Sequence, residues 1–161
     1  MAKQPIITFK SNEQFQEIAK EWQSKLFLGD WLMKFKLIDN NVLGETKSGG
    51  EELGLCYYDS LNKNAVITVA NGEGTIAEFT LVHELLHCLL EYANTDRLGD
   101  DEELDSVEMF YAQSIHARLN QMAKSLLMTK YPNITKDFFR IELEEFEKNV
   151  ERKTKEDYLN G

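Results

Sequence analysis

Two histidines and a glutamate within five consecutive residues carry the strongest chemical signal in this sequence. His83 and His87 stand four positions apart in the segment His83-Glu84-Leu85-Leu86-His87. On a helix, residues four apart lie one above the other, so both imidazoles can reach a single ion. Zinc suits two imidazoles and a carboxylate, and keeps a fourth position for water. We therefore expect a zinc site on this segment.

Glu84 is the candidate for acid–base chemistry at that site. It lies about 100° round the helix from His83, because an α-helix has about 3.6 residues per turn. From there its carboxylate can reach a metal-bound water without ligating the metal. It can take the proton of that water and deliver it to a leaving amine. We therefore expect Glu84 to be the general base of peptide-bond hydrolysis.

The surroundings of the motif favour a metal site over a purely structural role. Apolar residues precede and follow the two histidines: Ile76, Phe79, Leu81, Val82, Leu85, Leu86, Leu89 and Leu90. A helix that is apolar almost all round is typical of a buried element. Burying two imidazoles and a carboxylate is costly unless each finds a partner. A shared metal ion supplies that partner at once.

An acidic segment after His87 offers a third ligand. It contains Asp96, Asp100, Asp101, Glu102, Glu103, Asp105 and Glu108. Glu103 stands one helical turn before Val107 and in phase with Phe110, so it is predicted on the inward face of the next helix. Glu103 is therefore the predicted third zinc ligand.

Other residues near the site receive different interpretations. Glu102 and Glu108 flank the inward face and stay open as alternative ligands, whereas Asp100 or Asp101 is expected to cap the helix. His116 is interpreted as an ordinary surface or boundary residue, as lone histidines usually are.

The first half of the chain predicts one helix followed by strands. Ser11 and Gln14 form a capping-box pattern before apolar residues at helical spacing, which predicts a helix over roughly 11–27. Alternation from Trp31 predicts a strand with one wet side. Two further strands, 53–58 and 65–70, are predicted to form a hairpin.

The second half predicts helices only. Thr75 and Glu78 form a second capping-box pattern that opens the motif helix, which runs to about residue 92. A third helix is expected to stop before Pro132, and a charged fourth helix begins near residue 135. Strands followed by helices indicate the α+β class. We expect one domain over 1–161, with a short, mostly antiparallel sheet packed on the motif helix.

Composition narrows the class of partner. The 161 residues include 18 basic and 28 acidic side chains, giving a formal charge of −10, and 42% are hydrophobic. This surplus of acidic side chains disfavours binding to nucleic acid or to anionic membrane surfaces. No run approaches the ~20 apolar residues that span a bilayer, and no export signal is recognisable. We therefore expect a cytoplasmic protein in which Cys56 and Cys88 are reduced, buried thiols.

The segment from Leu81 to Leu90 resembles the active helix of HExxH zinc metallopeptidases. The wider layout, over roughly 28–115, is similar to small phage and prophage metallopeptidases related to the SprT-like group of zincins. The resemblance implies a zincin-like fold, zinc bound by His83 and His87, and Glu84 as general base. It also implies a peptide or protein substrate that pairs along strand 65–70 by β-augmentation.

The sequence departs from parts of that pattern. No glycine and third histidine follow at the metzincin spacing, and no Asn-Glu-x-x-x-Asp string follows the motif. The basic zinc-ribbon tail of SprT proteins that act near DNA is missing, so their crosslink repair is not carried over. Two other functions stay open: a zinc-stabilised, phage-type protein that binds a host protein without proteolysis, and an acidic mimic of nucleic acid.

Overall fold

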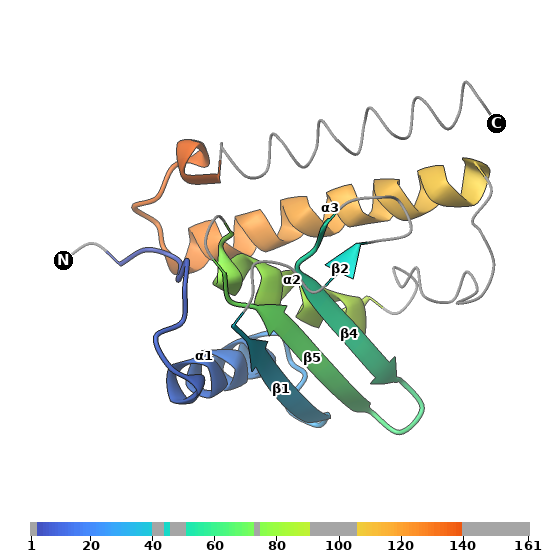
Figure 1. Ribbon diagram of the computed structural model, residues 1–161, viewed down its shortest axis with the longest axis horizontal. Helices are drawn as coiled ribbons and strands as arrows, with labels where there is room; N and C mark the ends of the chain where they lie inside the picture. Colours follow the sequence, from blue (N-terminus) through green and yellow to red (C-terminus); the bar gives the residue numbers. More distant parts are fainter. Residues whose placement is uncertain (1–2, 40–43, 46–50, 73–74, 91–105, 140–161) are drawn as a thin grey trace.

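The computed structural model describes residues 3–39, 44–45, 51–72, 75–90 and 106–139. Figure 1 shows helix α2 running between the strands of a small sheet and the long helix α3. The elements are α1 (Asn12–Lys25), β1 (Leu32–Ile38), β2 (Gly44–Glu45), β3 (Glu51–Glu52), β4 (Gly54–Asp59), β5 (Asn64–Ala70), α2 (Ala77–Leu89), α3 (Ser106–Lys130) and the short 3₁₀ helix η3 (Lys136–Phe139). The predicted α+β class is confirmed.

Helix α1 forms where the sequence predicts it. The backbone N–H of Gln14 donates to the Ser11 hydroxyl oxygen at 3.1 Å, which satisfies one of the free donors at the helix start. Phe15, Ala19 and Trp22 recur at helical spacing and are buried against the rest of the core. The capped start and the apolar stripe together explain the position of this helix.

The main sheet has the strand order β1-β5-β4. Strands β4 and β5 pair antiparallel, which confirms the predicted hairpin, whereas β1 pairs with β5 in parallel. The sheet is therefore mixed. The expectation that strand 65–70 forms an edge is wrong, because β5 is hydrogen-bonded on both sides. In the part of the chain that the structure describes, the strand at the edge beside the motif helix is β4.

Helix α2 is buried along almost its whole length, as its composition predicts. It packs against β4 and β5 on one side and against α3 on another. The predicted capping box at its start is wrong, because the N-cap is Ile76 and makes no side-chain cap hydrogen bond. Instead, the N–H groups of Ala77 and Glu78 donate to the carbonyl oxygens of Ile7 and Ile6, both at 3.0 Å. The N-terminal segment thus caps this helix.

Helix α3 ends at Lys130, before Pro132, as predicted. Its buried side chains from the middle onward are Leu119, Asn120, Ala123 and Leu127. The predicted end of the motif helix near residue 92 and most of the predicted fourth helix lie outside the described residues. Among the described helices, none is long and apolar enough to cross a membrane.

Candidate metal centre

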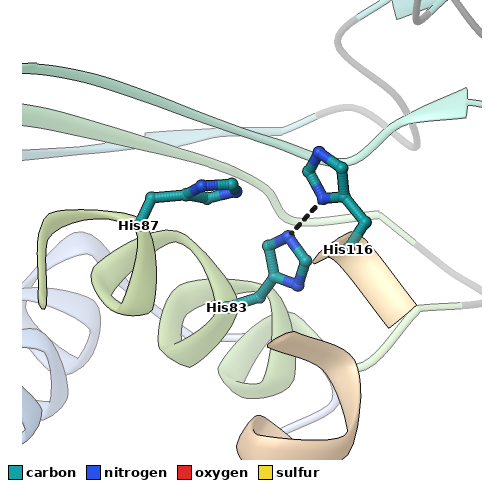
Figure 2. A group of neighbouring side chains, drawn as sticks. All are labelled: His83, His87 and His116. Carbon is teal, nitrogen blue, oxygen red and sulfur yellow. Dashed lines mark hydrogen bonds between the residues drawn. The ribbon is translucent and has the colours of Figure 1, made fainter. Parts of the chain in front are cut away.

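Three histidines converge between α2 and α3. His83 and His87 come from successive turns of α2, and His116 comes from α3 (Figure 2). One nitrogen from each ring lies within 4.8 Å of the other two. The ring centroids form a nearly equilateral triangle, with separations of 5.1, 5.2 and 5.1 Å. The predicted pairing of His83 with His87 is confirmed as a spatial arrangement, and a third imidazole joins it.

His116 is a boundary residue, as interpreted, but it is not an ordinary one, because it joins the histidine cluster. Its ring is half-buried and stacks on the ring of His83 with an interplanar angle of 5°. His116 lies one turn before Asn120 and two before Ala123, and both of these residues are buried. The inward face of α3 therefore includes His116, although small and polar residues hide that face from a hydrophobic pattern.

His83 has a defined partner on each ring nitrogen. Its Nδ1 donates to the amide oxygen of Asn120 at 2.7 Å, and both residues are buried. Its Nε2 lies 3.1 Å from Nδ1 of His116. A neutral imidazole with hydrogen on Nδ1 carries its lone pair on Nε2. The lone pair of His83 therefore faces His116, on the side where His87 also lies.

The spacing of the nitrogens fits a small divalent cation. Two nitrogens bound to one tetrahedral zinc at about 2.0–2.1 Å are about 3.3 Å apart. The 3.1 Å between His83 Nε2 and His116 Nδ1 is close to this value. The limit of 4.8 Å over all three rings is wider, so the imidazoles would have to move closer together to hold a single ion. Three imidazoles are an established ligand set for zinc.

Burial keeps the rings of His83 and His116 uncharged. Burial holds the pKa of His83 well below 6.5, the nearby His116 and His87 lower it further, and the hydrogen bond with Asn120 opposes the shift. Burial also lowers the pKa of His116 to about 4. At neutral pH these two imidazoles are therefore neutral, which is the form that binds a metal.

Glu84 projects from α2 toward the start of strand β4. A Cβ atom added to Gly54 would lie 2.7 Å from Glu84 Oε1 and 2.7 Å from Thr80 Cγ2. Real side chains do not tolerate such distances, so glycine at position 54 makes the close approach possible. The Glu84 carboxylate is thus buried against the edge strand, on the helix face next to that of His83.

Strand β4 follows α2 in register beyond this contact. Gly54 lies against Glu84, and Cys56 lies against Cys88, with their sulfur atoms 3.4 Å apart. Two strand residues and four helix residues both advance about 6 Å, so the two elements stay in step. Both thiols are buried and are not joined in a disulfide, as expected, because a disulfide requires about 2.05 Å. This packing holds β4 alongside the motif helix.

The acidic residues predicted as third ligands are not placed by the structure. Glu103 and Glu102 lie outside the described residues. Glu108 falls within α3, but its side chain also lies outside the described set. Glu103 as a zinc ligand therefore stays a prediction. Among the described residues, the cluster of His83, His87 and His116 is the group of three side chains placed to hold a metal ion.

Comparison with known proteins adds no relative. No family model matches the chain, and no similar protein was found among curated proteins or solved structures. The function is therefore argued from the residues and their geometry.

Proposed function

We propose that this protein is a zinc-dependent peptidase, similar to the small phage and prophage metallopeptidases of the zincin group. One observation carries the proposal: three imidazoles converge, and the first of them is followed in the chain by a glutamate. A structural use of the same residues needs only separate hydrogen bonds and does not require the rings to meet. A metal-dependent hydrolase requires both the meeting point and the neighbouring carboxylate.

The residues of the chain define what zinc would contribute. His83, His87 and His116 would hold it as three neutral ligands, which is the ligand number of catalytic zinc sites. When bound, zinc supplies a Lewis acid and lowers the pKa of a water toward neutrality. No protein charge at the three ligands offsets the charge of the cation. This ligand set therefore favours hydrolytic chemistry at neutral pH.

Glu84 is the residue proposed to move the proton. It is adjacent to His83 in sequence, and its carboxylate lies on the face of α2 that meets β4, next to the face of His83. It can therefore act beside the metal without replacing an imidazole. In the proposed reaction Glu84 accepts a proton from water and returns it to the nitrogen of the departing amine.

Strand β4 supports the choice of an extended peptide as substrate. Among the described strands it is the terminal one of the β1-β5-β4 sheet, and it pairs there with β5 on one side. A peptide that pairs with the other side gains main-chain hydrogen bonds without demanding a particular sequence. The close contact of Gly54 with Glu84 would bring that peptide to the proposed base.

The test replaces Glu84 with glutamine and measures zinc content and hydrolysis of an unfolded protein such as casein. The wild-type protein should bind about one zinc per chain and cleave casein. Glu84→Gln should keep the zinc and lose at least about 100-fold in rate, because general-base catalysis contributes about 10²–10⁴-fold. An active Glu84→Gln protein, or a wild-type protein without affinity for zinc, contradicts the proposal.

The same experiment separates the alternative function. A zinc-stabilised protein that acts only by binding another protein retains the metal but shows no hydrolysis in the wild type. Its thermal stability then falls on chelation, while Glu84→Gln has no effect on its biological action. That combination contradicts the peptidase proposal and supports the binding function.

A further inference from the structure

Helix α3 supplies two polar groups to the histidine cluster, one helical turn apart. His116 provides an imidazole, and Asn120 accepts a hydrogen bond from the Nδ1 of His83 at 2.7 Å. The Asn120 side chain is only 4% exposed, and its neighbours Leu119 and Ala123 on α3 are also buried. A buried amide needs a reason to be there, because removing it from water without compensating hydrogen bonds is costly.

The arrangement of atoms determines which proton state of His83 fits. Nδ1 faces the oxygen of Asn120, which can only accept a hydrogen bond. Nε2 faces the other imidazoles and lies 3.1 Å from His116. Hydrogen on Nδ1 therefore leaves the Nε2 lone pair toward the cluster. The opposite tautomer would set two lone pairs against each other at Asn120 and place hydrogen where a metal would bind.

We propose that Asn120 is a positioning residue, which fixes the tautomer of His83 and aims its Nε2 at the metal. The inference rests on the proposed zinc site and assigns it a residue that the sequence motif does not contain. His116 and Asn120 share one helix. The packing of α3 on α2 therefore positions two groups at once: His116 as a proposed ligand, and Asn120 as the residue that orients His83.

An amide at this position also limits charge. A carboxylate would accept the same hydrogen bond, and it would add a negative charge that makes the imidazole a stronger donor. Asn120→Asp is therefore the conservative variant that keeps the acceptor. Asn120→Leu has a similar shape and removes the acceptor. These two variants separate hydrogen bonding from packing.

The first measurement reads the tautomer of His83 directly, in metal-free protein, from long-range ¹H–¹⁵N correlation spectra. The chain has only three histidines, so few signals need assignment. At pH 8 ordinary imidazoles are neutral. We expect hydrogen on Nδ1 of His83 in the wild type and in Asn120→Asp, and mixed tautomers in Asn120→Leu. Hydrogen on Nε2 in the wild type, or an unchanged tautomer in Asn120→Leu, overturns the proposal.

The second measurement is zinc affinity, by competition with a chromophoric chelator. Residues that orient a metal-binding histidine typically contribute about 10- to 100-fold in affinity, and we expect a loss of that size in Asn120→Leu. Asn120→Asp should bind at least as tightly as the wild type. Gln121→Leu, on the exposed side of the same helix, is the matched control and should bind normally. Equal affinity in Asn120→Leu and Gln121→Leu overturns the proposal.

The two readouts distinguish failure of this inference from failure of the zinc site. A wild-type protein that has the expected tautomer but binds no zinc contradicts the proposed function and leaves the role of Asn120 in orienting His83 supported. Zinc binding that is indifferent to Asn120 contradicts the inference alone. If Asn120→Leu does not fold, Asn120→Ala is measured in the same two ways.

Discussion

Helix α2 carries two buried polar clusters, and they differ in the groups that surround them. Near its start, the Glu78 carboxylate is fully buried and accepts hydrogen bonds from four groups: the N–H of Ile6, Nε1 of Trp22, Nζ of Lys130 and the hydroxyl of Tyr131. About one and a half turns later comes His83, and together with His87 it meets His116. We call these the Glu78 cluster and the histidine cluster.

The two clusters differ in whether hydrogen-bond donors face an acceptor. In the Glu78 cluster one acceptor is surrounded by donors, and burial together with the Glu78 carboxylate raises the pKa of Tyr131, so its hydroxyl stays protonated. In the histidine cluster three imidazoles face one another: Nε2 of His83 lies at hydrogen-bond distance, 3.1 Å, from Nδ1 of His116, and burial lowers the pKa of His83, with a further lowering by His116 and His87. The first arrangement is complete within the protein. We propose that a cation completes the second.

The largest expected effect comes from removing the complete cluster. Glu78→Ala leaves Lys130 and the other donors without their acceptor, and breaking such a buried pair costs about 3–5 kcal/mol. Urea denaturation should show a loss of this size in the free energy of unfolding. Glu21→Ala is the control, because Glu21 meets the same Lys130 at 3.4 Å on the surface. That change should cost less than about 1 kcal/mol. Equal losses in the free energy of unfolding for Glu78→Ala and Glu21→Ala would contradict the view that the buried Glu78 cluster stabilises the protein more than the surface ion pair.

The second prediction concerns the histidine cluster as the proposed zinc site. Free zinc at 100 times its dissociation constant should raise the free energy of unfolding of the wild type by about 2.7 kcal/mol. His87→Ala should show no comparable gain, because it lacks one of the three proposed ligands. Denaturation with and without zinc measures both. The same gain in both proteins would show that zinc binds elsewhere.

A smaller effect is expected where Glu84 meets the sheet. In Gly54→Ala the added methyl overlaps Thr80 and Glu84, and overpacking of this kind costs about 1–3 kcal/mol. Gly29→Ala is the matched control, since a Cβ there meets nothing within 4 Å. Thermal denaturation of the two variants compares them. Gly54→Ala should also slow casein hydrolysis without loss of zinc, and a normal rate would argue against the proposed role of Glu84 beside β4.

The smallest effect is expected far from both clusters. Ser11→Ala removes the side-chain cap of α1 and should reduce the free energy of unfolding by about 1 kcal/mol. Zinc affinity should not change, because the cap does not touch α2 or α3. A marked loss of zinc binding in this variant would mean that the site depends on overall stability and not on its own ligands.

Local patterns predicted most of the elements correctly. The cap at Ser11, the alternation from Trp31 and the apolar motif helix each depend on neighbouring residues, and each forms as expected. The start of α2 was mispredicted because its cap comes from Ile6 and Ile7, about 70 residues earlier. The Glu78 carboxylate, which the capping-box pattern assigns to the helix start, instead accepts hydrogen bonds from Trp22, Lys130 and Tyr131, which are also distant in the sequence. A contact between distant segments leaves no local signature.

The candidate site also has a part that the sequence alone predicts and a part that it does not. The spacing of His83, Glu84 and His87 is a local property of one helix, so the sequence alone predicts the two histidines and the glutamate between them. His116 was missed because a hydrophobic pattern places the inward face of α3 along Ile115, Leu119 and Met122. In the structure Met122 is 40% exposed, and the inward face includes Asn120 and Ala123. A polar, small-residue face is visible only once the helices are packed together.

The most direct test of the account is the zinc content of His116→Ala beside Glu103→Gln and the wild type, after equilibration with zinc and gel filtration. A three-histidine centre predicts about one zinc per chain in the wild type and in Glu103→Gln, and none in His116→Ala. Retention of zinc by His116→Ala, with loss in Glu103→Gln, would contradict the three-histidine centre and restore the acidic third ligand that the sequence alone predicts.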